Sequence, residues 1–530
     1  MSEIFEKCAI DGVYSTHEAV TPIAVTMLHH MNHRGQEGAG IITYNESGEI
    51  RMHKESGWAK NIFTKEVVDA LSETDPIIAV GHDRYSVSGG PEAWQPYERN
   101  GIALVQNGNS TNAMSMLEQL PSDLRNNIGS DTDIQSRRLD ILIQEYNGDL
   151  LEACRQLARE SEGANNWIIA GQGKLIAMRD PWGFHPLSIG ENGAELERTY
   201  VVASETSAYV SPLQMRYVRD VEPGEGIVID KDGLRTFFKD ERADTLPSAQ
   251  CIFELIYFAA PDAFIFGKHV GTIRKQLGRA LARQDIESGY DPGMIVPVQQ
   301  SGIVHAVGYA QEYIEHYIKN REKYGFTDDE LAEKISSLHI QFGLIRNPYS
   351  GRTFIDPGDK RLANSGKLRS DDHEIEGNKV TLIDDSIVKG HAQETSQRLM
   401  KNAREVHVRV ASPPIRHPCY WAIDFAERSE LVAAYAEGED VEEFVREKTG
   451  AKSLRYIPAL QVLQIAMGEE AFSALLLKQT RTIEETAEKM KLFSDPAIGE
   501  IYSHSDYCGA CFHGVQPTDV AGVYRKNHDI

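Results

Sequence analysis

Cys8 is the residue of the N-terminal half best suited to act as a nucleophile. Polar segments follow it at 33–40 (HRGQEGAG), 81–86 (GHDRYS), 107–109 (NGN) and 130–133 (SDTD). A thiolate that attacks a carboxamide such as that of glutamine needs a base and donors for the developing oxyanion. An Asn side chain and a Gly N–H can supply those donors, while Arg can bind an α-carboxylate and Asp an α-ammonium group. The set therefore predicts hydrolysis of an amino-acid amide.

Each member of this set also has a simpler interpretation. A lone Cys8 can pack as a small hydrophobe, and Arg84 can form a surface ion pair. Asn107-Gly108 is a type I′ turn pair, and Asp131 suits a helix cap. The occurrence of all four, in order, is what favours the catalytic interpretation.

A second group of chemically competent residues lies at 380–390 (VTLIDDSIVKG). Asp384 and Asp385 follow an apolar run, where they can accept sugar hydroxyls and face a Mg²⁺ ion directly or through water. The turn that contains Gly390 can offer N–H groups to a phosphate. An acidic pair is also common as a helix N-cap, but the strand before it and the glycine after it favour a ligand-binding site.

The elements that position the first group are expected to be antiparallel hairpins up to about residue 235. Short apolar runs separated by glycine-rich turns indicate the strands, and they lie at 102–105, 167–170, 175–178 and 201–203. Helical periodicity interrupts them at 18–32 and 131–160.

From about residue 250 strand-like and helix-like segments alternate, which predicts a parallel, doubly wound sheet. The strand-like runs lie at 294–298, 380–383 and 406–411, and the helix-like stretches at 271–287, 303–320 and from 393. Ligands bind such sheets at the carboxyl ends of the strands, where Asp384 and Asp385 lie. A charged helical pattern at 480–492 begins the tail.

Length and composition set broad limits on the function. The 530 residues suffice for two to four domains. The net charge of −24 excludes non-specific nucleic-acid binding as the main function, because phosphate contacts need a basic face. No run approaches the ~18 apolar residues of a membrane span, and the first seven residues carry three charges and no secretory signal. We therefore expect a cytoplasmic protein with no membrane or nucleic-acid partner.

The motifs of the N-terminal half, extended by RDPWGFHPL (179–187) and SET (204–206), resemble the N-terminal-nucleophile glutamine amidotransferases. Within them they resemble the amidophosphoribosyltransferase family, which makes the first committed step of purine synthesis. The second half resembles the same family at 251–267, 296–302, 347–358 and 406–424.

The resemblance implies an α+β N-terminal-nucleophile hydrolase sandwich of αββα layers, followed by an α/β type I phosphoribosyltransferase domain with a parallel sheet. The implied divisions are a propeptide at 1–7, a glutamine amidotransferase domain at 8–240, a phosphoribosyltransferase domain at 250–470 and a helical tail with cluster ligands at 471–530. The implied partners are glutamine, phosphoribosyl pyrophosphate and purine nucleotides as feedback inhibitors, in a homotetramer.

In the first domain the resemblance assigns Cys8 as nucleophile, with its α-amine as base once residues 1–7 are removed. An α-amine titrates near ~7.7–8.0, which suits a base at neutral pH. Asn107 and Gly108 would form the oxyanion hole, and Arg84 and Asp131 would hold the glutamine backbone groups.

In the second domain the resemblance assigns a phosphoribosyl-pyrophosphate site with bound Mg²⁺. The implied binding residues are Asp384, Asp385, Ser386, Lys389, Gly390, His391 and Arg352. The implied Mg²⁺ site contains Ser301, Asp384 and Asp385.

The six cysteines are too few for a disulfide scaffold of this size. In the iron–sulfur branch of the family four of them bind a 4Fe–4S cluster, and the implied ligands are Cys251, Cys419, Cys508 and Cys511. Four thiolates fit either such a cluster or a structural zinc, and the family points to iron. Cys154 lies outside every motif and is expected to fill the core.

The chain departs from the family pattern at four places. His391-Ala392 stands where two Thr residues usually follow the phosphate-loop Gly, and Gln299-Gln300 where a Pro-Asp pair is usual. Ala9 replaces a Gly, and Asp83 is acidic where the family residue is not. These differences indicate a diverged branch. They leave two alternatives, a paralogue that uses a different phosphosugar acceptor and a non-catalytic, nucleotide-sensing homologue.

Overall fold

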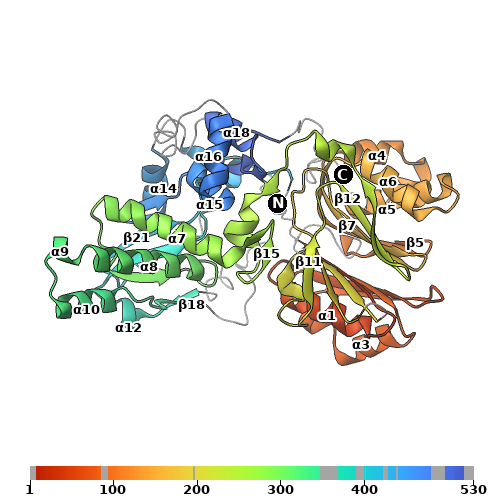
Figure 1. Cartoon of the computed structure of the whole chain (residues 1–530), viewed down its shortest axis with the longest axis horizontal. Coiled ribbons are helices and arrows are strands. Elements are labelled where there is room, and N and C mark those ends of the chain that lie inside the picture. The colour runs from red at the N-terminus through yellow and green to blue at the C-terminus, as the bar shows by residue number, and fades with distance from the viewer. Residues whose placement is uncertain are drawn as a thin grey trace.

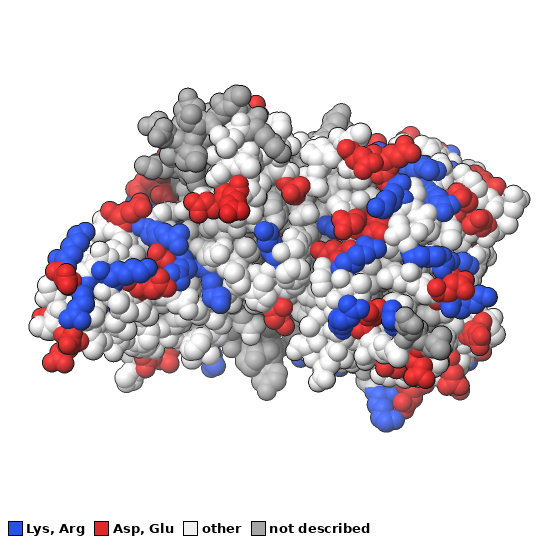
Figure 2. All heavy atoms as spheres, in the orientation of Figure 1, with Lys and Arg blue, Asp and Glu red and all other residues white. Residues whose placement is uncertain are grey.

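The computed structural model describes residues 8–84, 93–194, 197–346, 368–388, 399, 401–421, 428–436, 440–478 and 496–517. Figure 1 shows two lobes, with the N-terminal half (red to yellow) on one side and the second half (green to blue) on the other. Acidic and basic side chains are mixed over the face drawn in Figure 2, so on that face neither sign forms one large patch.

The N-terminal half contains two antiparallel sheets. The first has seven strands in the order β11-β9-β10-β1-β4-β2-β3. Its strands are β1 Ala9–Tyr14, β2 Gly38–Tyr44, β3 Ile50–Ser56, β4 Ile78–Arg84, β9 Ser188–Asn192, β10 Thr199–Ala203 and β11 Arg216–Asp220. The second has six strands in the order β13-β12-β8-β7-β6-β5. They are β5 Tyr97–Arg99, β6 Ile102–Ser110, β7 Gly163–Gly171, β8 Lys174–Met178, β12 Glu225–Asp230 and β13 Gly233–Lys239.

The two sheets pack face to face, with helices on their outer sides. Alternate residues of each strand point to opposite faces. Ile10 and Val80 of the first sheet therefore meet Val105 and Ile168 of the second in a shared core. Helices α1 Val20–Met31, α2 Ala59–Ile62 and α3 Lys65–Ser72 cover the first sheet. Helices α4 Ala113–Gln119, α5 Asp131–Glu145 and α6 Leu150–Glu160 cover the second. The expected αββα sandwich is confirmed.

The second half is built on a parallel sheet in the order β17-β20-β21-β22. Its strands are β17 Met294–Pro297, β20 Lys379–Asp384, β21 Glu405–Val410 and β22 Ser453–Tyr456. Neighbouring strand residues enter different cores, so Ile295 and Ile383 pack on one face while Val296 and Leu382 pack on the other. Helices α7 Val270–Glu287 and α8 Ile303–Lys319 contribute to the first of these cores, and α14 Val441–Thr449 to the second. The doubly wound sheet is confirmed.

Apart from short 3₁₀ helices, smaller elements complete the described part of the second half. They are β14 Gln250–Cys251, the π-helix Glu254–Phe258, β15 Phe264–Ile265, β16 Lys268–His269, α9 Arg321–Tyr324, α10 Asp328–Ser337, β18 Leu344–Arg346, β19 Leu368–Ser370, α12 Asp372–Ile375, α15 Ala459–Met467, α16 Glu469–Lys478, α18 Pro496–Tyr502, β23 Tyr507–Cys508 and α19 Ala510–His513. Within the described part of the chain no single helix is long and apolar enough to cross a membrane. The pair α15 and α16 passes a length and composition test but bends by 115° between its helices.

The structure differs from the sequence expectation in several local respects. The helical pattern at 131–160 is two helices, because Asn147 and Gly148 adopt positive φ angles of 54° and 90° and Asp149 then caps α6. Strand β22 and the helices α2, α3 and α4 were not predicted. The expected helices from 393 and at 480–492 lie outside the described residues. The domain limits remain predictions, and the one at 470/471 falls inside α16.

Candidate active site

Cys8 lies at the N-terminal end of the central strand of the seven-stranded sheet. It directly precedes β1, which runs between β10 and β4. Its side chain is only 6 % exposed. Its main-chain nitrogen donates to Oδ1 of Asn107, which belongs to β6 of the opposite sheet, over 3.4 Å. The nucleophile predicted from sequence therefore stands where the two sheets meet.

Asn107 and Gly108 lie inside β6, not in a turn. They pair with Asn166 and Asn165 of β7, so the type I′ turn interpretation is wrong. Gly108 has φ 148°, and a Cβ there would lie 1.8 Å from the carbonyl oxygen of Ala164, so the position requires glycine. The Nδ2 atom of Asn107 is buried and has no hydrogen-bond partner among the described residues. A buried donor without a partner, on the same amide that contacts Cys8, is available to an oxyanion.

Arg84 ends β4, the strand that neighbours β1. It is 5 % exposed, so the surface ion-pair interpretation is wrong. Its guanidinium donates to the carbonyl of Ala93. Its own carbonyl accepts from the N–H groups of Gln36 and Glu37 over 2.9 and 3.0 Å. The side chain is thus held near the end of β1 where Cys8 lies.

Asp131 is the first residue of α5 and is 2 % exposed. Its Oδ2 accepts from the N–H of Ser110, at the end of β6, over 2.9 Å. Burial raises the pKa of the Asp131 carboxyl, while N–H donors from Ser110 and Thr132 and the charge of Arg84 act in the opposite direction. Arg84 and Asp131 therefore lie within electrostatic reach of each other, so one site offers a cation and a carboxylate.

Asp384 and Asp385 occupy the carboxyl end of β20, as the sequence predicted. Asp384 ends the strand, and its Oδ1 accepts from the N–H of Asp385 over 2.9 Å. Ser386 Oγ donates to Asp385 Oδ2 over 2.6 Å. Burial and the neighbouring Asp385 carboxyl raise the pKa of Asp384. Two crowded carboxyl groups of this kind have the donor chemistry that Mg²⁺ prefers.

The loop that carries Ser301 packs against the same strand end. The N–H of Val298 donates to the carbonyl of Ile383 over 2.8 Å, and a Cβ on Gly302 would lie 2.3 Å from that carbonyl. The structure therefore brings the Ser301 loop beside the acidic pair. Four other predicted residues of this site, Arg352, Lys389, Gly390 and His391, lie outside the described residues.

The four predicted cluster ligands gather in one place. Cys251 on β14 stands opposite Cys508 on β23 in a parallel pair. The carbonyl of Cys511 accepts from the N–H groups of Arg416 and His417, both over 3.0 Å, close to Cys419 in the chain. Burial raises the pKa of the Cys511 thiol, and the nearby Cys419, Cys251 and Cys508 thiols raise it further.

Metal-binding geometry is a separate question from proximity. Among the described residues, no three or more His, Cys, Asp or Glu side chains are arranged in this structure so that they could hold a metal ion. None of the six cysteines, all of which the structure describes, forms a disulfide. Cys154 is fully buried in the core beneath α6, as expected.

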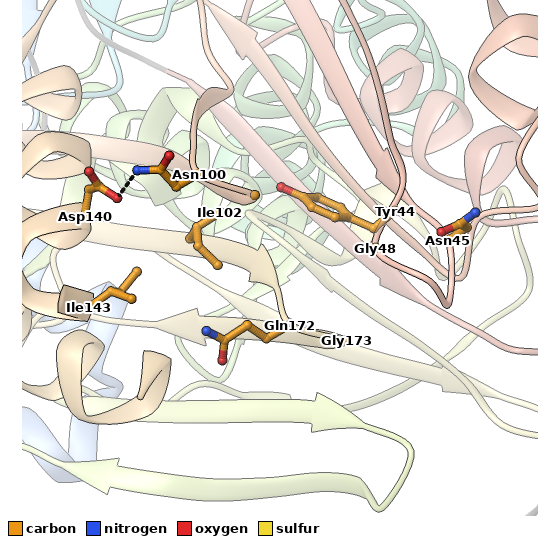
Figure 3. A pocket seen from close by; sticks show the side chains of 10 residues that line it. Tyr44, Asn45, Gly48, Asn100, Ile102, Asp140, Ile143, Gln172 and Gly173 are labelled. Atoms are coloured by element: carbon orange, nitrogen blue, oxygen red, sulfur yellow. Dashed lines mark hydrogen bonds between the residues drawn. The ribbon is translucent and has the colours of Figure 1, made fainter. Parts of the chain in front are cut away.

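A cavity of about 250 Å³ lies at the opposite end of the sandwich (Figure 3). It is lined by residues of the turns that follow Tyr44, precede Ile102 and contain Gln172, and Asn100 Nδ2 donates to Asp140 Oδ1 over 2.8 Å at its edge. Asn107 lies five residue steps along β6 from Ile102, which corresponds to about 17 Å. None of the predicted site residues lines this cavity.

Curated proteins and solved structures similar to this chain cover both halves. The amidophosphoribosyltransferase of Mycobacterium tuberculosis is 34 % identical over 468 residues, which span 85 % of this chain and 81 % of that protein. The amidophosphoribosyltransferase of Bacillus subtilis is 31 % identical over 97 % of this chain and 95 % of its own. The chain belongs to the amidophosphoribosyltransferase family.

Solved structures of the family agree with this assignment. The glutamine phosphoribosylpyrophosphate amidotransferase from B. subtilis, complexed with ADP and GMP, matches with a TM-score of 0.73 and 30 % identity over 97 % of this chain and 98 % of that one. The allosteric regulatory enzyme of purine biosynthesis matches with a TM-score of 0.74 and 29 % identity over 97 % of each chain. No protein-family model matches the chain.

The motif-based interpretation did not assign roles to two residues that the structure makes prominent. Arg34 and Glu254 lie in motifs quoted for the resemblance, HRGQEGAG and the segment 251–267. They meet in a buried ion pair across the two halves. Their separation of 220 residues leaves no local signal that would have paired them.

Proposed function

We propose that this chain transfers ammonia from glutamine to phosphoribosyl pyrophosphate, giving 5-phosphoribosylamine, pyrophosphate and glutamate, the first committed step of de novo purine synthesis. The contact of Cys8 with Asn107, whose other amide atom is an unsatisfied buried donor, is the observation that carries this proposal. Family membership supports it over both halves of the chain.

In the first half Cys8 attacks the side-chain carboxamide of glutamine. The C–N bond breaks, ammonia leaves with a proton from the general acid, and water then hydrolyses the thioester to glutamate. Asn107 Nδ2 and the Gly108 N–H stabilise the oxyanion. Arg84 binds the α-carboxylate and Asp131 the α-ammonium group. Removal of residues 1–7 would give Cys8 an α-amine that acts as the base and then as the acid.

In the second half ammonia displaces pyrophosphate from C1 of phosphoribosyl pyrophosphate. Asp384 and Asp385 hold the ribose hydroxyls at the carboxyl end of β20, with Ser386 and the segment 389–391 around the 5′-phosphate. Ser301 lies in the loop assigned to the pyrophosphate side, and Arg352 is proposed to bind phosphoribosyl pyrophosphate. When bound, Mg²⁺ would neutralise part of the pyrophosphate charge from the side of Asp384 and Asp385.

We propose a 4Fe–4S cluster on Cys251, Cys419, Cys508 and Cys511. The four thiols interact with one another, so they have the donor chemistry of such a cluster, and the family resemblance favours iron over zinc. The cluster would fix the tail to the segments around Cys251 and Cys419. Anaerobic purification should give a brown protein with visible absorption, and a colourless protein with one bound zinc would contradict the cluster.

Purine nucleotides are proposed as feedback inhibitors, since a family structure holds ADP and GMP. We also propose that the chain forms a homotetramer. Its proposed parts are an amidotransferase domain at 8–240, a phosphoribosyltransferase domain at 250–470 and a tail at 471–530.

The reaction is tested by pyrophosphate release from phosphoribosyl pyrophosphate with Mg²⁺. Release is expected with glutamine and also with ammonium salts at alkaline pH, and glutamate should form in step with pyrophosphate. Release with another phosphosugar but not with phosphoribosyl pyrophosphate would overturn the acceptor. Release with neither nitrogen donor would support a non-catalytic homologue.

A further inference from the structure

A fully buried ion network joins the glutaminase half of the chain to the phosphoribosyltransferase half. Arg34 is 2 % exposed, and Glu205 and Glu254 are both 0 % exposed. Arg34 Nη1 donates to Glu254 Oε1 over 3.2 Å, and Nη2 donates to Glu254 Oε2. The guanidinium therefore binds this carboxylate in a bidentate manner. Arg34 Nε donates to Glu205 Oε1 over 3.1 Å.

The three residues come from three separate parts of the chain. Arg34 lies in the turn between α1 and β2, Glu205 follows β10, and Glu254 begins the π-helix of the second half. Glu205 reaches across as well, because its Oε2 accepts from the N–H of Ala260 over 2.7 Å. The network therefore ties the two halves together in both directions.

Charge complementarity keeps these groups ionised in spite of their burial. Burial favours the neutral acid, but the charges of His33 and Arg34 lower the pKa of Glu205 to about 2. Burial likewise opposes ionisation of Glu254, and Arg34 and His185 lower its pKa. A buried ion pair is no more stabilising in general than a well-packed apolar contact, but breaking one side of it is costly. Such a pair is suited to fixing a geometry.

The geometry that it fixes belongs to the glutamine site. A Cβ on Gly35 would lie 2.5 Å from the carbonyl carbon of Asp83, so the turn that carries Arg34 rests directly on the backbone of β4. The next two residues, Gln36 and Glu37, donate their N–H groups to the carbonyl of Arg84. A shift of Arg34 would therefore move the hydrogen bonds that hold Arg84.

We propose that Glu254, a residue of the second half, is a positioning residue for glutamine binding in the first half, acting through Arg34 and the 34–37 turn on Arg84. This inference rests on the proposed function, because it takes Arg84 as the group that binds the α-carboxylate. A residue of the phosphoribosyltransferase half therefore contributes to glutamine binding in the other half.

The test is the variant Glu254→Gln, which keeps the side-chain volume but removes the charge that Arg34 grips. We expect the KM for glutamine to rise about 10- to 100-fold, the size of effect that a small misplacement of a binding group produces. The ammonia-dependent kcat should stay within about twofold of the wild type, because Glu254 lies outside the acceptor site. A pure loss of folding would instead lower both activities in the same proportion.

A matched control exists inside the second half. Asp285 forms an equally buried ion pair with Arg409, Nε to Oδ2 at 2.6 Å, that does not cross to the first half. Asp285→Asn should leave the ratio of glutamine-dependent to ammonia-dependent activity unchanged, even where it lowers both.

If Glu254→Gln does not fold, Arg34→Lys decides the question, because Lys keeps the charge and loses the two-pronged fork. An unchanged KM for glutamine, or an equal fall of both activities in the folded variant, overturns the proposal. Absence of glutamine-dependent pyrophosphate release in the wild type is a different result, which overturns the proposed function itself.

Discussion

Replacement of Asn107 by Asp removes the proposed oxyanion donor while it keeps the other oxygen of this side chain. Asp has the same shape and keeps the Oδ1 acceptor that contacts the main-chain nitrogen of Cys8 at 3.4 Å. It replaces only Nδ2, which donates no hydrogen bond in the described structure. The substitution therefore removes no ground-state hydrogen bond of the free enzyme from that atom.

The expected size of the effect follows from this arrangement. One oxyanion-hole donor contributes about 10²–10³ in kcat, or about 2.7–4 kcal/mol. Nδ2 has no hydrogen-bond partner in the free enzyme, and it donates to the oxyanion once that forms. The loss should therefore appear in kcat for glutamine hydrolysis, while the KM for glutamine stays within about twofold of the wild type. Asn107→Ala removes this donor and also the Oδ1 acceptor that contacts Cys8, so its loss should be at least this large. Asn107→Asp keeps the acceptor, but its carboxylate also repels the oxyanion, so its loss should likewise exceed that of the donor alone.

The assay compares initial rates of glutamate formation with ammonia-dependent pyrophosphate release in both variants. Ammonia-dependent release should not change, since Asn107 is not among the residues assigned to the acceptor site. A thermal melt checks folding, because Asn107 is 1 % exposed and a buried charge can destabilise β6. A kcat for glutamine within tenfold of the wild type in folded Asn107→Asp would refute this role of the amide.

Three further outcomes are expected. Gly108→Ala should abolish glutamine-dependent activity and lower the melting temperature, since a Cβ 1.8 Å from the Ala164 carbonyl forces β6 and β7 apart; a variant with wild-type melting and activity would contradict the close packing. Asp131→Asn should raise the KM for glutamine roughly tenfold or more, because a charge-assisted hydrogen bond contributes about 1.5–3 kcal/mol. If steady-state kinetics show an unchanged KM, Asp131 does not bind the α-ammonium group. The pKa of Glu205 is lowered from 4.5 to about 2, so ionised Glu205 contributes about 3 kcal/mol to the free energy of unfolding. This contribution is present above about pH 4.5 and is lost as the pH falls toward 2. An acid titration followed by tryptophan fluorescence should show the loss in the wild type and a smaller pH dependence in Glu205→Gln.

The layers of the fold could be predicted because they follow from local patterns. Short apolar runs with glycine turns gave the antiparallel sheets, and alternation of strands with helices gave the parallel sheet. The position of Asp384 at a strand end followed from the same rule, since ligands of parallel sheets bind at the carboxyl ends. The break at Asn147 and Gly148 was missed, although an Asn-Gly pair readily adopts positive φ angles.

The contacts that make the active site could not be predicted in the same way. Cys8 and Asn107 are 99 residues apart and lie on different sheets, so only the packing of one sheet on the other brings them together. The resemblance named both residues but not the unsatisfied Nδ2. Arg34 and Glu254 both lie in motifs that the sequence analysis quoted. Their pairing, however, depends on how the two halves dock, which no local periodicity encodes.

The central claim is that two separate sites share one ammonia, and Cys8→Ala tests it most directly. Glutamine-dependent and ammonia-dependent pyrophosphate release are measured on the same preparation of this variant and of the wild type. We predict that glutamine-dependent release is abolished while ammonia-dependent release is retained. Equal loss of both activities, or retention of glutamine-dependent release, would contradict the account.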